Sequence, residues 1–121
     1  QSIHVLHPYN LGFAGVVMVV SSTSDRLESL LTEGDTYEGF ELRAVRHIAD
    51  YFNYWARPKL WLEQVMYSYE REDGLLPPPQ LSIASWLVSG MCASIIVRIV
   101  RGEFVKTFPK FYYYSDYDDL N

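Results

Sequence analysis

The sequence predicts an all-α protein in which amphipathic helices precede a single transmembrane helix. Apolar residues recur every three or four positions over 36–56 and 58–72, a pattern typical of helices with one buried face. No charged residue occurs over 81–97, and three prolines at 77–79 separate that run from the helices before it. A small soluble α+β domain is the alternative fold class.

The composition is that of one ordered domain. Of the 121 residues, 49% are apolar and 21% are charged, proportions typical of a chain that folds around a core. The net charge of −5, without a basic stripe, argues against a nucleic-acid partner because phosphate contacts need clustered Lys and Arg. The single cysteine, Cys92, forms neither an internal disulfide nor a zinc site by itself.

The N-terminal segment leaves two alternatives open. Residues 1–24 contain no Asp, Glu, Lys or Arg. The stretch 3–21 is long enough for a second apolar span, although two histidines and a proline interrupt it. The β-branched run over 16–20 favours a buried strand or a core helix segment instead.

Helix-starting signals recur in the next part of the chain. Asp35 and Glu38 form a capping box, and Pro58 suits the first turn of a helix. The predicted helices run over about 25–33, 36–56 and 58–72. Trp55 and Trp61 lie on the last two helices, and we expect them to contact a partner surface because tryptophan is enriched in such contacts.

The uncharged run decides the membrane prediction. The seventeen residues of 81–97 measure about 26 Å as a helix, which is the short end of what crosses a bilayer. We therefore expect a transmembrane helix over 81–100. Small residues at four-residue spacing would let a neighbouring helix approach closely in lipid. These helix-packing residues are Ser85, Ser89 and Ala93, with Gly90 and Ser94 one residue further round.

The flanks of the predicted span carry an orientation signal. Four basic residues follow it closely: Arg98, Arg101, Lys106 and Lys110. By the positive-inside rule, the C-terminus then faces the matrix, stroma or cytoplasm. We expect the membrane to be an organellar inner membrane.

In the alternative α+β fold, the same region forms a β-hairpin. Residues 94–101 and 104–108 contain β-branched residues, and Gly102 lies in the turn between them. In that fold 81–93 is a short buried helix and 11–20 is a partner strand.

No cluster of residues predicts catalysis. His4 and His7 are three positions apart but lack a nearby third metal ligand, and His47 lies on a predicted helix surface. Cys92 has no histidine close in sequence to activate it. Phosphate-binding glycine loops and nucleophile elbows are absent from the sequence. We therefore expect no catalytic, cofactor-binding or metal-binding residue.

The predicted layout divides the chain into four parts. These are a helical extramembrane region over 1–76, a proline-rich hinge over 77–80, the span over 81–100 and an aromatic, acidic tail over 101–121. A hydrophobic helix with polar extensions resembles, in layout only, the accessory subunits of respiratory, photosynthetic and ATP-synthase complexes. The resemblance implies a non-catalytic structural subunit whose partners are other subunits of a membrane complex and the lipid bilayer.

Two other functions remain as alternatives. The first is a soluble α+β protein-interaction module, with the uncharged run in its core. The second is an enzyme that combines His4, His7 or His47 with distant acids, and the missing motifs make it the weaker of the two.

Overall fold

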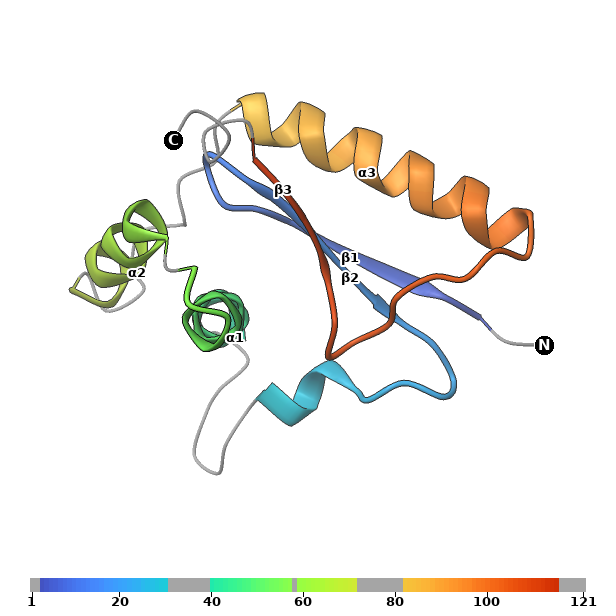
Figure 1. The fold of residues 1–121 in the computed structure, drawn as a ribbon, viewed down its shortest axis with the longest axis horizontal. Helices are drawn as coiled ribbons and strands as arrows, with labels where there is room; N and C mark the ends of the chain where they lie inside the picture. Colours follow the sequence, from blue (N-terminus) through green and yellow to red (C-terminus); the bar gives the residue numbers. More distant parts are fainter. Residues whose placement is uncertain (1–2, 31–39, 58, 72–81, 116–121) are drawn as a thin grey trace. The chain divides into compact units, whose positions relative to one another are not determined.

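The computed structural model has an α+β fold, so the all-α prediction is wrong (Figure 1). The structure describes residues 3–30, 40–57, 59–71 and 82–115. Its elements in chain order are β1 (Val5–Asn10), β2 (Gly15–Val20), the 3-10 helix η1 (Leu27–Leu30), α1 (Phe40–Tyr54), α2 (Leu60–Arg71), α3 (Ser82–Val100) and β3 (Tyr112–Tyr114).

The chain forms two compact units. The sheet unit combines Gln1–Leu27 with Pro79–Asn121, and the helical unit is Glu28–Pro78. The described strands and α3 all belong to the sheet unit, whereas α1 and α2 belong to the helical unit.

A tight hairpin near the N-terminus confirms the buried-strand option for residues 16–20 and excludes the core helix segment there. The strands β1 and β2 pair antiparallel, from Val5 opposite Val20 to Asn10 opposite Gly15. The turn is closed by the Gly12 N–H, which donates to Asn10 Oδ1 at 2.9 Å. Gly12 has a φ of +89°, which glycine adopts at little cost. The stretch 3–21, considered above as a second apolar span, thus forms this hairpin.

Strand β2 is the centre of a three-stranded sheet with the order β1-β2-β3. Its other neighbour, β3, comes from near the end of the described chain and pairs antiparallel, with Val17 opposite Tyr112. The Phe108 N–H extends this pairing by donating to the Val19 carbonyl at 2.7 Å. The Ser115 hydroxyl donates to the Phe13 carbonyl, which ties the end of β3 to the hairpin turn.

The core of the sheet unit lies between β2 and α3. Val17, Val19 and Ile95 are buried there, and Met91 and Cys92 pack against them. Because side chains alternate along a strand, the equally buried Val16 and Met18 project from the other face of β2. A strand that is buried on both faces is apolar at every position, which explains the continuous valine-rich run.

Helix α3 approaches strand β2 so closely at position 15 that only glycine fits there. A Cβ atom at Gly15 would lie 2.8 Å from the Val88 Cγ2 atom and 3.2 Å from the Val88 backbone nitrogen. The helix runs through Val100, so the alternative hairpin over 94–108 is also wrong. It ends in a Schellman motif, in which the Glu103 N–H donates to the Arg98 carbonyl at 2.9 Å and Gly102 has a φ of +72°.

The helical unit matches the sequence prediction where it is described. Helices α1 and α2 confirm the predictions over 36–56 and 58–72 within the described residues, and a short 3-10 helix, Leu27–Leu30, lies where a helix over 25–33 was expected. The buried residues of α1 follow the expected three- and four-residue spacing: Ala44, Val45, Ile48 and Ala49.

Candidate interaction surface

The candidate site is the side of α3 that faces away from the sheet. The inner side of this helix includes the buried residues Ala84 and Ile95. The opposite side exposes Trp86 to 81%, Val97 to 53% and Val100 to 80%. We name the exposed apolar set the outer face, and its members are Ile83, Trp86, Ala93, Ile96, Val97 and Val100.

The outer face is far less polar than a helix on a soluble sheet normally is. Such a helix usually turns charged residues to water, but residues 82–97 carry none. Ser85 and Ser89 add little polar surface, because the Ser89 hydroxyl donates to the Ser85 carbonyl at 2.9 Å. The Ser85 hydroxyl accepts from Asn10 Nδ2 at 2.8 Å. A contiguous exposed apolar surface of this kind marks an interaction site.

The structure gathers the predicted helix-packing residues on exposed positions of one helix. These are Ser85, Ser89, Gly90, Ala93 and Ser94, and none of them lies in the buried core against the sheet. A Cβ atom at Gly90 would meet no other atom within 4 Å. The predicted contact residues Trp55 and Trp61 belong to the helical unit, where Trp55 is 58% exposed and Trp61 is half-buried.

By length and composition, α3 is able to cross a membrane. It is the one helix of the described residues that is long and apolar enough, and only 11% of its 18-residue apolar segment is buried. The core helices of soluble proteins pass the same test, but they do so while mostly buried. The combination of membrane-like composition and exposure is what distinguishes α3.

A basic region begins at the C-terminal end of α3. It contains Arg98, Arg101, Lys106 and Lys110. Arg101 Nε pairs with Glu103 Oε1 at 3.1 Å. The Arg98 guanidinium carbon lies 5.9 Å from the centre of the Tyr112 ring, and Lys106 Nζ lies 4.4 Å from the same point. Within the described part of the chain, no carboxylate pairs with either of these two cations. Cation–π contacts hold both of them in place.

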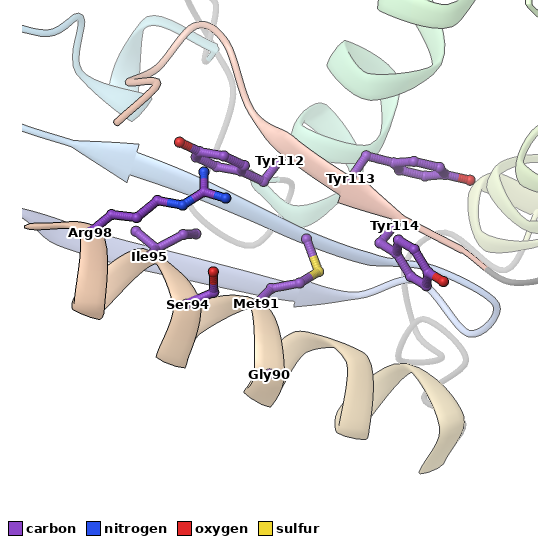
Figure 2. A pocket seen from close by; sticks show the side chains of 8 residues that line it. All are labelled: Gly90, Met91, Ser94, Ile95, Arg98, Tyr112, Tyr113 and Tyr114. Atoms are coloured by element: carbon purple, nitrogen blue, oxygen red, sulfur yellow. The ribbon is translucent and has the colours of Figure 1, made fainter. Parts of the chain in front are cut away.

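A pocket of about 330 Å³ opens between α3 and β3 (Figure 2). Helix α3 supplies its apolar wall, with Met91 and Ile95, and also the Arg98 side chain. Strand β3 supplies the opposite wall, and by strand alternation Tyr112 and Tyr114 project from the same face of it. The complete lining is Gly90, Met91, Ser94, Ile95, Arg98, Tyr112, Tyr113 and Tyr114.

The described histidines and the cysteine are distributed over different elements. Among the described residues, no three His, Cys, Asp or Glu side chains gather as metal ligands. His7 lies in β1 and His47 lies in α1, so they belong to different units. Cys92 packs against the core, and burial raises the pKa of its thiol, which makes it a weaker nucleophile.

Comparison with known proteins adds no relative. No family model, no curated protein and no solved structure matches this chain.

The pocket was not predicted from the sequence. Residues 112–114 were expected in an aromatic, acidic tail, whereas they form an edge strand beside β2. Alternation over three tyrosines is too short a signal to identify a strand. The contact of Arg98 and Lys106 with Tyr112 depends on that strand register, so sequence spacing alone does not reveal it.

Proposed function

We propose that this protein is a non-catalytic structural protein that attaches to a membrane by the outer face of α3, with the helix lying in the plane of the interface. The exposed apolar outer face is the observation that carries this proposal. Trp86 is 81% exposed, and Phe104, just beyond the C-terminal end of the helix, is also 81% exposed. Aromatic side chains of this kind favour the boundary between headgroups and acyl chains.

The contact between α3 and the sheet favours a lying helix over a spanning one. The inner side of α3 packs on β1 and β2, and β1 forms one edge of the sheet. If the helix crossed the bilayer in this fold, the open backbone groups of that edge would enter hydrocarbon, at a cost of several kcal/mol for each unpaired group. In the lying orientation, only the outer face enters the bilayer.

The charge distribution supports the same orientation. The basic region contains Arg98, Arg101, Lys106 and Lys110 against the single acid Glu103. The helical unit contains ten acidic and five basic residues, which accounts for the net charge of −5. The cations beside the outer face therefore suit a negatively charged headgroup layer, although the chain as a whole is acidic.

The role of accessory subunit in a membrane complex stays a prediction. The small residues Ser85 and Ser89, beside the outer face, and Ala93, within it, are exposed, and they would allow a helix of another subunit to approach closely. The same residues favour the second candidate function, a protein-interaction module that binds a partner helix. Purification in mild detergent from its source membrane would test both of these functions. In either case we expect the protein to stay with a stoichiometric partner.

Flotation with lipid vesicles tests the membrane attachment. We expect the wild-type protein to rise with the vesicles, and the variant Trp86→Glu/Val97→Glu to remain in the dense fraction. Both positions are exposed, so this variant keeps its fold, which circular dichroism would verify. The control Ser22→Glu/Thr23→Glu adds the same charges at exposed loop positions of the same unit, and it should float like the wild type.

Two outcomes would contradict the attachment. In the first, the wild-type protein stays in the dense fraction with every vesicle composition. In the second, the outer-face variant floats as well as the loop control does.

A further inference from the structure

We infer that the pocket between α3 and β3 binds the phosphate headgroup of an anionic membrane lipid, an inference resting on the membrane attachment proposed above. The pocket is continuous with the outer face. Gly90 and Ser94 line it. Gly90 lies four residues after Trp86 and Ser94 lies three residues before Val97, so these residues share a side of the helix. A bilayer in contact with the outer face would bring its headgroups to the mouth of the pocket.

The charge of the pocket identifies the ligand as an anion. Arg98 and Lys106 both lie against the Tyr112 ring, at 5.9 and 4.4 Å from its centre. Two cations on one ring repel each other, and no carboxylate of the described residues compensates them. Of the two, Arg98 lines the pocket. Its guanidinium group can bind a phosphate in a bidentate way, and the bound negative charge would reduce this repulsion.

The pocket also fixes the positions of these groups. The Tyr112 hydroxyl accepts a hydrogen bond from the Lys106 backbone N–H at 2.9 Å, so the ring is anchored at the base of the basic loop. Figure 2 shows the Arg98 side chain extending from α3 toward Tyr112. A site whose cations are already positioned loses less entropy when it binds a ligand.

The remaining lining suits the part of a lipid next to its phosphate. Met91 and Ile95 form an apolar wall, and Gly90 leaves the space beside them open. The exposed Ser94 hydroxyl is available to donate to a phosphate or glycerol oxygen. The volume of about 330 Å³ is at the lower end for ligand sites, so it fits a headgroup and the first chain atoms, while the rest of the lipid remains in the bilayer.

Vesicle partitioning with two matched charge variants tests this site. The pocket variant Arg98→Ala/Lys106→Ala and the control Arg101→Ala/Lys110→Ala each remove two cations from the same region. The measurement compares vesicles of phosphatidylcholine alone with vesicles that also contain phosphatidylglycerol. Urea unfolding of both variants verifies that their stability is unchanged.

We expect the wild type to prefer the anionic vesicles. A cation near the surface contributes about fivefold to partitioning, so diffuse attraction alone would cost each variant up to roughly 25-fold on anionic vesicles. The pocket variant should lose several-fold more than that on anionic vesicles and nothing on neutral ones. The control should lose several-fold less, because Arg98 lines the pocket and Lys106 contacts its Tyr112 wall, whereas Arg101 and Lys110 are not among the lining residues.

The failures of the site and of the attachment are distinguishable. Equal binding of the wild type to both kinds of vesicle would overturn the headgroup site and leave the attachment intact. Equal losses for the two charge variants would also overturn it, because they would indicate diffuse attraction. Absence of binding to any vesicle would overturn both.

Discussion

Ala56 and Gly102 occupy the same position in two helix ends. After α3, the Glu103 and Gly102 N–H groups donate to the Arg98 and Ile99 carbonyls. After α1, the Arg57 and Ala56 N–H groups donate to the Phe52 and Asn53 carbonyls in the same pattern. The residue at the bend has a positive φ in both, +72° at Gly102 and +56° at Ala56. Glycine adopts this conformation freely, whereas alanine is strained in it.

Exchanging these two residue types should therefore have opposite effects. Ala56→Gly should stabilise the protein by about 0.5–1 kcal/mol, the relief of strain minus the extra entropy of glycine in the unfolded chain. Gly102→Ala should destabilise it by about 1 kcal/mol. Urea unfolding measures both changes, and a loss of stability in Ala56→Gly would contradict the helix end described for α1.

Gly15 and Gly90 lie on the two elements that meet in the sheet unit, but only Gly15 is enclosed. Gly15→Ala places a methyl group against the Val88 backbone, and we expect a loss of about 1–3 kcal/mol from overpacking. Gly90→Ala meets nothing within 4 Å, and it should gain about 0.5–1 kcal/mol from helix propensity. Thermal unfolding of both variants checks the pair. Equal effects would mean that α3 does not pack on β2 as described.

At the scale of elements, α3 has apolar residues on two sides for two different reasons. The inner side packs against the sheet, and the outer face is exposed. The absence of charged residues over 81–97 predicted a helix over 81–100, which is nearly the observed length of α3. The same absence concealed the division between the two sides, because an apolar residue in a protein core and one at a membrane look alike in sequence.

Neighbouring isoleucines in α3 test this division. Ile95 is 2% exposed and Ile96 is 51% exposed. We expect Ile95→Ala to destabilise the protein by about 2–5 kcal/mol through the cavity it leaves, and Ile96→Ala to change stability by less than about 0.5 kcal/mol. Denaturant unfolding without lipid measures both. Similar values for the two variants would contradict the packing of α3 on the sheet.

The hairpin shows the limit of prediction for strands. The valine-rich run over 16–20 raised a buried strand as one option, and β2 confirms that option. Its partner β1 contains Pro8, which the sequence analysis counted as an interruption. Proline is tolerated in β1 because that strand is at the edge of the sheet. Edge position depends on the whole sheet, so periodicity along one segment does not reveal it.

At the scale of the whole molecule, the sheet unit is discontinuous in sequence. Residues 28–78 separate the hairpin from α3 and β3. The helices of that intervening part were predictable because their periodicity is local, whereas the expected caps at Asp35, Glu38 and Pro58 lie outside the described residues. The pairing of β2 with β3, and the pocket that depends on it, were not predictable because they join residues almost one hundred positions apart.

The unequal charge of the two units gives a prediction for the full chain. Glu28 and Asp50 are exposed residues of the acidic helical unit. Their repulsion should weaken binding to anionic vesicles at low salt, so Glu28→Gln/Asp50→Asn should bind several-fold more strongly there. The gain should vanish in 1 M salt, where the Debye length is about 3 Å, and on neutral vesicles. A gain that persists on neutral vesicles would indicate an apolar cause.

The sheet order also determines how the protein must be made. The central strand β2 leaves the ribosome before α3 and β3, which cover its face and edge and are synthesised after residue 81. At about 5–20 residues per second, translation of the intervening segment lasts on the order of ten seconds or less. During that interval a valine-rich, uncharged strand has only β1 as a neighbour, and such segments are prone to aggregate. Nascent chains of this protein should therefore depend on a chaperone until α3 has been completed.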